Sequence, residues 1–412
     1  MTDHSLPAPH KSWGAVFAMS LAAFVLVASE FMPVSLLTPI AADLHITEGQ
    51  AGQGISVSGL FALFTSLLIP LVAARVDRKP LLISLTLLMI LSGTVVAFAP
   101  NYVVFMIGRA LIGVAIGGFW SLSAATAMRL VPDDQVTRAM AIVNGGNALA
   151  TVIAAPLGSF LGALIGWRGA FLCVIPVAIV ACIWLLFSLP RMTTQSGSGT
   201  GNVFKLMKST PIALGMVAVS VFFMGQFMLF TYLRPFLETV THVSVSMLPL
   251  MLLVLGLAGL AGTFLIEAFL KNGLYRTLIV IPILMAAIAL ALVSFGSSAA
   301  TTTVLLGLWG LVATAAPVGW WTWLARTLPD EAEAGGGLMV AIIQLAIASG
   351  ATVGGLVFDS SGYRATFELS AALLGVAAVL AFLAARVAEA PSRVFHKLRL
   401  APTCMQSGHT LK

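Results

Sequence analysis

Arg129-Leu-Val-Pro-Asp-Asp134 recurs 197 residues later as Arg326-Thr-Leu-Pro-Asp-Glu331. A second stretch, Gly166-Trp-Arg-Gly-Ala-Phe171, recurs 196 residues later as Gly362-Tyr-Arg-Ala-Thr-Phe367. Two independent matches at nearly the same offset predict that the chain is a duplicated unit. Between the two copies lies Gln195-Ser-Gly-Ser-Gly-Thr-Gly201, which has the composition of a flexible linker.

The composition of the repeated unit indicates a membrane protein. Of the 412 residues, 59% are hydrophobic and only 9% are charged, whereas soluble domains average about 45–50% and about 25%. A membrane span needs about 20 apolar residues, and twelve such stretches can be placed. They begin near residues 14, 50, 80, 102, 137, 169, 213, 244, 276, 299, 335 and 366.

The linker divides these stretches into six and six. Backbone groups in lipid must be hydrogen-bonded internally, so long apolar stretches are expected to be helices. Because six is an even number, both halves enter the membrane in the same orientation and form a parallel repeat. We therefore predict an all-α membrane protein of twelve transmembrane helices in two six-helix repeats.

The domain boundaries follow from this division. We expect an amino-terminal half at residues 1–189, a linker at 190–212, a carboxy-terminal half at 213–387 and a tail at 388–412. The first stretch contains Glu30, Pro33 and Pro39, which is unlike a cleaved signal peptide, so we expect a retained first helix. The chain has three cysteines, an odd number, so we do not expect a disulfide framework.

The basic residues predict the orientation. The net charge is +6, but 17 of the 21 Lys and Arg residues fall on the side of the membrane that carries the amino terminus. This asymmetry is typical of cytoplasmic loops, so the linker, the tail and both termini are predicted to be cytoplasmic. The positive charge is thereby explained without a nucleic-acid partner.

Three motifs resemble those of the major facilitator superfamily, in its drug:proton antiporter branch. Ala73-Ala-Arg-Val-Asp-Arg-Lys79 resembles the loop motif G-x-x-x-D-R-x-G-R, with both glycines missing. Arg109-Ala-Leu-Ile-Gly113 is similar to R-x-x-Q-G, and Ala154-Ala-Pro-Leu-Gly-Ser159 to a weakened G-P-P-L-G-G. The resemblance implies the major facilitator fold, a substrate site between the halves, and a gating role for Asp77 and Arg78.

Further stretches resemble bacterial purine ribonucleoside efflux pumps and arabinose-efflux-like permeases: Glu30-Phe-Met-Pro-Val-Ser-Leu-Leu-Thr-Pro-Ile40, Gly118-Phe-Trp-Ser-Leu-Ser123, Ala155-Pro-Leu-Gly-Ser-Phe-Leu-Gly162, Phe230-Thr-Tyr-Leu-Arg-Pro235 and Pro317-Val-Gly-Trp320. This resemblance implies a proton-coupled efflux antiporter in the bacterial inner membrane, with purine ribonucleosides such as inosine and guanosine as cargo. We expect a monomer whose partners are its small-molecule substrate, protons and lipid, with no metal and no cofactor.

Glu30 and Arg109 are the only acid and the only base that we place deep inside the spans. Both lie about 12–15 Å from the outer ends of their helices at 1.5 Å per residue. An ionisable group inside a membrane is by default a functional candidate. The first and fourth helices of such a half line the central cavity, as the resemblance implies, so these residues are candidates for proton coupling. The alternative is a static buried pair that orients the two helices.

Polar and aromatic residues within the spans are the candidate substrate contacts. Asn147 aligns with Gln344 at the 197-residue offset, so the two halves would present amides symmetrically. Amides hydrogen-bond polar ligands, and Trp and Tyr offer a face to a flat ring. Buried amides also hold helices together, and Trp often marks the membrane interface, so a structural role is the alternative for each. The candidates are Asn144, Asn147, Trp120, Gln226, Tyr232, Trp320 and Gln344.

The sequence also bears on functions other than nucleoside efflux. Within transport, efflux of drugs such as chloramphenicol or of sugars such as arabinose is the alternative. A membrane-embedded enzyme is disfavoured, because none of the six His residues lies in a span centre and no H-E-x-x-H motif or serine nucleophile elbow is present. An ATP-driven pump would need a G-x-x-x-x-G-K-[ST] loop, which the sequence lacks.

Overall fold

The computed structural model describes residues 12–73, 75–132, 135–192, 207–328 and 332–399. These residues form helices joined by short loops and contain no strand, which confirms the predicted all-α class. The amino-terminal helices are α1 (Trp13–Leu44), α2 (Glu48–Ala73), α3 (Arg78–Ala97), α4 (Tyr102–Leu130) and α5 (Val136–Ser188). The carboxy-terminal helices are α7 (Thr210–Thr231), α8 (Leu233–Thr239), α9 (Leu248–Phe295), α10 (Ala299–Ala313), α11 (Ala316–Thr327) and α12 (Ala332–Arg399).

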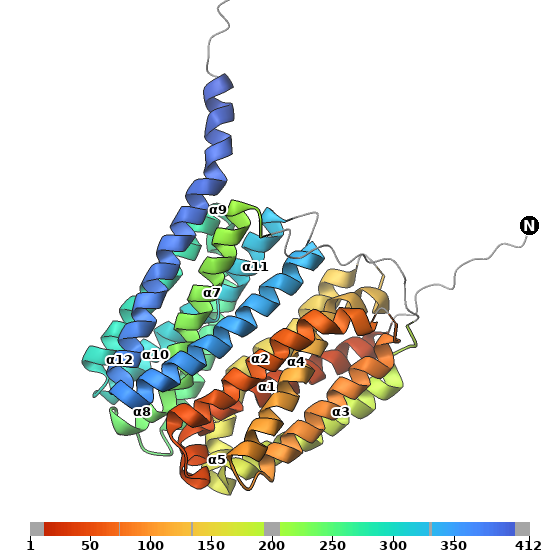
Figure 1. The fold of residues 1–412 in the computed structure, drawn as a ribbon, viewed down its shortest axis with the longest axis vertical. Coiled ribbons are helices and arrows are strands. Elements are labelled where there is room, and N and C mark those ends of the chain that lie inside the picture. Colours follow the sequence, from red (N-terminus) through yellow and green to blue (C-terminus); the bar gives the residue numbers. More distant parts are fainter. Residues whose placement is uncertain (1–11, 74, 133–134, 193–206, 329–331, 400–412) are drawn as a thin grey trace, which may run out of the picture.

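Ten helical stretches among the described residues are long and apolar enough to cross a membrane. Two of them, Arg138–Ser188 in α5 and Gly335–Ala388 in α12, have 51 and 54 residues. A straight helix of that length would measure about 80 Å, far more than the roughly 30 Å of the bilayer core. Each is instead bent at a glycine and folds back on itself (Figure 1). The ten stretches are therefore compatible with the twelve predicted crossings.

The two turning points are Gly166 and Gly362. Their φ angles are +75° and +77°, a conformation that glycine adopts readily and other residues rarely do. Both residues begin the repeated Gly-x-Arg stretch that revealed the duplication. The repeat therefore marks equivalent hairpins, one in each half.

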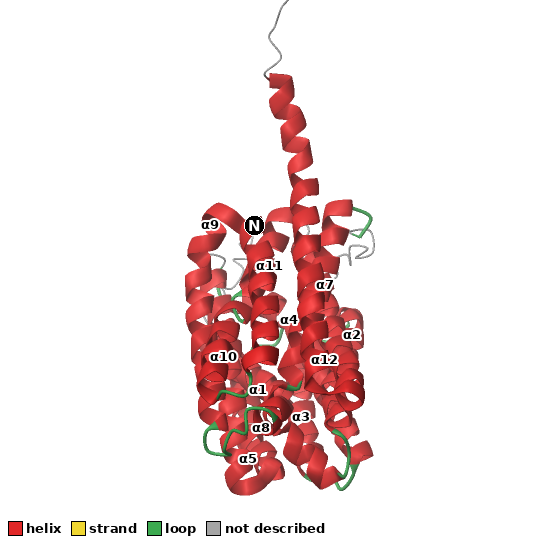
Figure 2. Ribbon diagram, turned by 90° about the vertical axis from the view of Figure 1, so that its left-hand side faces the viewer, coloured by secondary structure: helices red, strands yellow, loops and turns green. Residues whose placement is uncertain are grey.

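The helices form two groups that lie side by side. Figure 1 shows α1 to α5 in red to yellow at the lower right and α7 to α12 in green to blue at the upper left. Figure 2 shows that the helices run roughly along one common axis. The groups meet where α2 packs on α12, α5 on α9 and α1 on α8. The share of residues buried in the most apolar window is 72% for the span of α1 and 61% for the span of α7 and α8. It is 33–56% for the other spans, so these two spans are the central ones.

The close packing of α4 on α2 depends on small residues. A Cβ added to Gly113 would clash with the Ser58 carbonyl oxygen, and one added to Gly117 with the Ala62 carbonyl oxygen. Both neighbours belong to α2, so the two glycines let α4 approach α2 closely. This contact brings the Arg109 side chain of α4 within reach of α1 and α2.

Candidate functional site

Arg109 is buried in the amino-terminal half, with 1% of its surface exposed. Its Nε donates to the Gly54 carbonyl oxygen at 3.1 Å and its Nη1 to the Ser29 carbonyl oxygen at 2.8 Å. Its Nη2 donates to the Glu30 carbonyl oxygen at 2.9 Å and to Ser58 Oγ at 3.2 Å. The guanidinium group thus ties α4 to α1 and α2 through main-chain oxygens.

The acceptor on α1 is available because of Pro33. Within an α-helix, the amide of residue 33 would bond the carbonyl of residue 29, but proline has no N–H to donate. The Ser29 carbonyl is therefore left without its helical partner, and the Arg109 guanidinium occupies it. A buried carbonyl without a donor costs free energy, and the hydrogen bond from Arg109 offsets the cost that Pro33 would otherwise cause.

The Glu30 carboxyl group lies on the other side of this contact. Glu30 is 4% exposed and feels the charge of Arg109, but among the described residues none of the hydrogen bonds of Arg109 goes to the carboxylate. The side chain beside the carboxyl group is that of Gln344, which belongs to α12 in the opposite half. The two predicted ionisable groups therefore meet through the Glu30 backbone and not as a direct ion pair.

Two side-chain amides of the carboxy-terminal half have a buried and unused acceptor atom. Among the described side chains, Oε1 of Gln344 and Oε1 of Gln226 are buried and accept no hydrogen bond. An unsatisfied buried acceptor costs about 1–3 kcal/mol. Gln226 lies on α7 and Gln344 on α12, so both amides come from the carboxy-terminal half.

Three phenylalanines that were not predicted form a cluster, and two of them follow Glu30 and Gln226 directly in the sequence. Phe31 of α1 stacks on Phe227 of α7, with ring centroids 5.6 Å apart and an interplanar angle of 28°. Both rings also meet the edge of Phe230, at 6.5 and 5.9 Å. This cluster joins the two halves through the helices that carry Glu30 and Gln226. The sequence could have indicated this cluster, because Phe31 directly follows Glu30 and Phe227 directly follows Gln226.

The remaining predicted contacts are spread over the molecule. Asn144 on α5 is exposed and donates to the Met140 carbonyl of its own helix at 3.0 Å, while Asn147 is half-buried. Trp120 on α4 is half-buried and lies edge-on against Phe119. Trp320 on α11 is 2% exposed and packs on Trp323 and Phe222 in the carboxy-terminal core.

Tyr232 lies at the end of the bundle opposite to Trp13, where α1 begins. We call this the distal end and define it by Asp43, Tyr232 and Asp359. The Tyr232 side chain is fully buried, its hydroxyl donates to the Ala351 carbonyl at 2.7 Å, and its ring stacks on Phe358. The phenol is therefore engaged in packing between α7, α12 and the nearby α2, where Gly52 touches it.

Apart from the contact of Glu30 with Gln344, the hydrogen bonds that join the two halves, among the described residues, lie toward the distal end. Asp359 of α12 accepts from Thr47 Oγ1 at 2.5 Å and from the Gly49 amide at 3.0 Å, and so caps the start of α2 from the opposite half. Gln53 Nε2 of α2 donates to the Thr352 carbonyl at 3.5 Å. A carboxylate at a helix amino terminus is stabilised by the free amides and the helix dipole.

Arg234 of α8 makes the third connection. Its Nη1 donates to the Ser35 carbonyl of α1, and its Nε to Glu238 at 2.8 Å. Ser35 lies four residues before Pro39, so this carbonyl is again one that a proline has left free. The two prolines of α1 thus provide two arginine sites, one within the half and one across the halves.

The predicted gating loop lies at the opposite end. Asp77 caps α3 by accepting from the Lys79 amide at 2.8 Å, and its second oxygen accepts from the Met192 amide at 2.9 Å. The carboxylate therefore ties the loop after α2 to the segment that follows α5. Arg78 is the first residue of α3.

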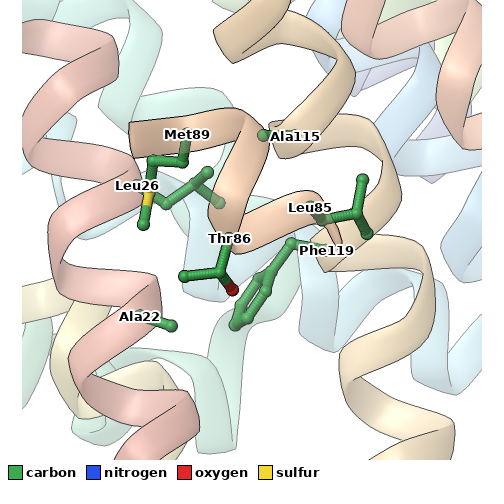
Figure 3. A pocket seen from close by; sticks show the side chains of 7 residues that line it. All are labelled: Ala22, Leu26, Leu85, Thr86, Met89, Ala115 and Phe119. Atoms are coloured by element: carbon green, nitrogen blue, oxygen red, sulfur yellow. The ribbon is translucent and has the colours of Figure 1, made fainter. Parts of the chain in front are cut away.

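A small apolar gap inside the amino-terminal half is not part of this site. Figure 3 shows its lining, in which Thr86 is the only polar residue. The Thr86 hydroxyl already donates to the Leu82 carbonyl at 2.8 Å. A gap without a free polar group has nothing to orient a polar ligand. The lining residues are Ala22, Leu26, Leu85, Thr86, Met89, Ala115 and Phe119.

Comparison with known proteins places the chain in a family. The family model described as Major Facilitator Superfamily matches residues 19–348. The chain is 59% identical over 395 residues to the transcription regulatory protein OpdE of Pseudomonas aeruginosa, covering 95% of this chain and 98% of that one. It is 40% identical over 380 residues to the purine ribonucleoside efflux pump NepI of Salmonella paratyphi B, covering 92% and 95%.

Solved structures share the fold at low sequence identity. One is a bacterial homologue of the human lysosomal transporter Spinster, with a TM-score of 0.75, 16% identity, and coverage of 96% of this chain and 100% of that one. Another is the human organic anion transporter MFSD10, with a TM-score of 0.61, 17% identity and coverage of 91% and 99%. The chain therefore belongs to the major facilitator superfamily, and it is a membrane transporter and not an enzyme.

Proposed function

We propose that the protein is a proton-coupled antiporter that exports purine ribonucleosides such as inosine and guanosine. The observation that carries the proposal is the position of the Glu30 carboxyl group, buried between the halves beside Gln344. The 40% identity to a purine ribonucleoside efflux pump over nearly the whole chain supports the choice of cargo.

Glu30 has the surroundings that a proton carrier needs. Burial disfavours a charged carboxylate and the nearby Arg109 cation favours it, so the two effects oppose each other. Arg109 is held by four other oxygens, so it need not move when the carboxyl group gains or loses a proton. The carboxyl group can therefore change its charge while the helix packing around it is kept.

Gln344 links this charge to the opposite half. A carboxylate only accepts hydrogen bonds, whereas a protonated carboxyl group can also donate one. The Gln344 side chain can donate through Nε2 to a charged Glu30, and its free Oε1 can accept from a neutral one. Protonation of Glu30 would thus change the contact between α1 and α12, which is the step that alternating access requires.

The substrate would bind beside this contact. The free acceptor atoms of Gln226 and Gln344 suit the hydroxyl and amino donors of a nucleoside. The rings of Phe31, Phe227 and Phe230 offer apolar faces for a flat base. We propose that further residues contact the substrate as the halves move. They are Asn144, Asn147, Trp120 and Trp320, the last of which packs on Phe222 of α7.

We place the distal end outside the cell and both termini in the cytoplasm of a bacterium, with the inner membrane as the site of action. The hydrogen bonds of Asp359 and Arg234 then join the halves on the external side. In this state the substrate site would open toward the cytoplasm, where an efflux pump collects its cargo.

One transport experiment distinguishes nucleosides from the other candidate cargoes. Inverted membrane vesicles containing the protein are tested with labelled inosine, guanosine, arabinose and chloramphenicol, with and without a pH gradient. We expect the gradient to drive accumulation of the two nucleosides. Accumulation of chloramphenicol or arabinose alone would replace nucleoside efflux by drug or sugar efflux.

Regulation of transcription is the second candidate, because the relative with 59% identity carries that name. The two functions are separated by a Glu30→Gln variant expressed in cells at the wild-type level. If transport is the primary function, any effect of the protein on transcript levels should be lost together with transport. An effect that persists in a transport-negative variant would favour a direct regulatory role.

A further inference from the structure

A groove lies on the carboxy-terminal half, between the second arms of α9 and α12. It is lined by Tyr275, Arg276, Ile279, Val280, Phe382, Ala385 and Arg386 and has a free volume of about 430 Å³. This volume falls in the range of about 300–1,000 Å³ that is usual for small-molecule sites. The groove belongs to one half alone and is separate from the contact between Glu30 and Gln344.

The two arginines of the groove come from different helices and have no carboxylate partner among the described residues. The Arg386 guanidinium carbon lies 4.8 Å from the centroid of the Phe382 ring, which holds its charge at the groove. Nearby Lys271, in contrast, is paired with Glu267. As far as the side chains are described, the groove therefore presents two positive charges that no carboxylate neutralises.

The height of the arginines in the membrane is given by the spans that carry them. Arg276 lies three residues after Gly273, where the two arms of α9 meet, and Arg386 is the first charged residue after the uncharged stretch 369–385 of α12. Both guanidinium groups thus lie where apolar helix gives way to the interface, the depth of phospholipid headgroups.

An apolar track leads from the groove into the membrane. Ile279 and Val280 line its α9 side, and Ile283, one turn deeper, is 51% exposed. On the α12 side Phe382 is followed one turn deeper by Val379, which is 58% exposed. Residues three and four apart share a helix face, so both walls continue toward the bilayer core.

We propose that this groove binds an anionic phospholipid, with the phosphate between Arg276 and Arg386 and an acyl chain along Ile279, Ile283 and Val379. Positive charge at headgroup depth with an apolar track beneath it matches the two parts of such a lipid. A soluble anion would use only the arginines.

The test is a lipid titration of the full chain in detergent, followed by native mass spectrometry. Dioleoylphosphatidylglycerol and dioleoylphosphatidylcholine are the probes. Each basic residue near an anionic lipid contributes about a factor of five, so Arg276→Ala/Arg386→Ala should weaken phosphatidylglycerol binding about 25-fold. The control Lys208→Ala/Lys271→Ala removes the same charge from exposed positions outside the groove and should change binding less than about twofold.

Three results would overturn the proposal. An equal loss in the control variant would reduce the effect to general surface charge. Equal affinity of the wild-type protein for the two lipids would show that the headgroup charge is not recognised, and this comparison does not depend on how well the double variant folds. Displacement of the lipid by inorganic phosphate at a similar concentration would show that the site takes a soluble anion.

Discussion

Nη2 of Arg109 donates to the main-chain oxygen of Glu30 at 2.9 Å and leaves the carboxyl group of that residue for Gln344. The only acid and the only base predicted deep in the spans therefore meet with distinct tasks. Arg109 holds α1 at the helix bond that Pro33 cannot make, and Glu30 faces the opposite half. This separation allows the structural and the proton-carrying contributions to be tested by different substitutions.

Replacing Arg109 should damage the fold. Arg109→Ala leaves the Ser29, Glu30 and Gly54 carbonyls without their donor in a buried site, and loss of one partner of a buried charged network costs about 3–5 kcal/mol. We expect a low yield and a lowered melting temperature in purified protein. Glu30→Gln keeps every one of these bonds and should melt close to the wild type. A stable Arg109→Ala variant would show that the main-chain bonds are dispensable.

Gln344 should be needed for coupling and not for folding. Gln344→Leu keeps a similar side-chain volume and removes an amide whose Oε1 has no partner, so its stability should match or exceed that of the wild type. The loss of the contact with Glu30 should uncouple transport from the pH gradient while downhill exchange persists. The measurement is nucleoside flux in vesicles with and without the gradient. Full gradient-driven accumulation by this variant would rule out Gln344 as the link.

The capping of α2 by Asp359 should hold the distal end together. Asp359→Ala removes the acceptor for Thr47 and Gly49, and loss of a helix cap costs about 1 kcal/mol, a factor of about five in the open population. In a background without native cysteines, Ser56→Cys should react with maleimide about five times faster when Asp359→Ala is added. Glu267→Ala, in an exposed pair with Lys271, is the control. Equal labelling rates in all three proteins would remove Asp359 from the closure.

Phe31 should favour flat-ring cargo. Phe31→Leu keeps an apolar side chain but removes the ring that stacks on Phe227, and stacking of a base on an aromatic ring contributes about 1–3 kcal/mol. We expect the KM for inosine to rise at least about fivefold. Ribose, which lacks a base, serves as a competitor whose weak inhibition should not change. An unaltered KM for inosine would place the base elsewhere.

Sequence reasoning located the helices well because their signals are local. The first four predicted starts lie within two residues of the observed ones, and Gly166 and Gly362 stand at the turns that the repeat marked. An apolar stretch bounded by charge, Pro or Gly decides such positions without reference to the rest of the chain.

The site was harder to predict because a side chain inside a membrane span can either pack in the protein core or line the substrate site. Trp320 and Tyr232 are aromatic residues within spans, and hydropathy does not tell whether such a ring packs in a core or faces a substrate. No sequence motif singled out Asp359 or the role of Arg234. Their contacts with Gly49 and Ser35 depend on how the halves meet, which no local pattern contains.

The central claim, that Glu30 carries the proton, is tested most directly by accumulation of labelled inosine in inverted vesicles under an imposed pH gradient. Glu30→Gln keeps the shape and hydrogen-bonding capacity of the side chain and removes its titration. Glu267→Gln makes the same chemical change in an exposed pair and serves as the matched control. We predict that Glu267→Gln accumulates inosine like the wild type, whereas Glu30→Gln folds normally and exchanges inosine downhill but shows no gradient-driven accumulation. Undiminished accumulation by a well-folded Glu30→Gln variant would contradict the account and leave Glu30 a structural role between α1 and α12.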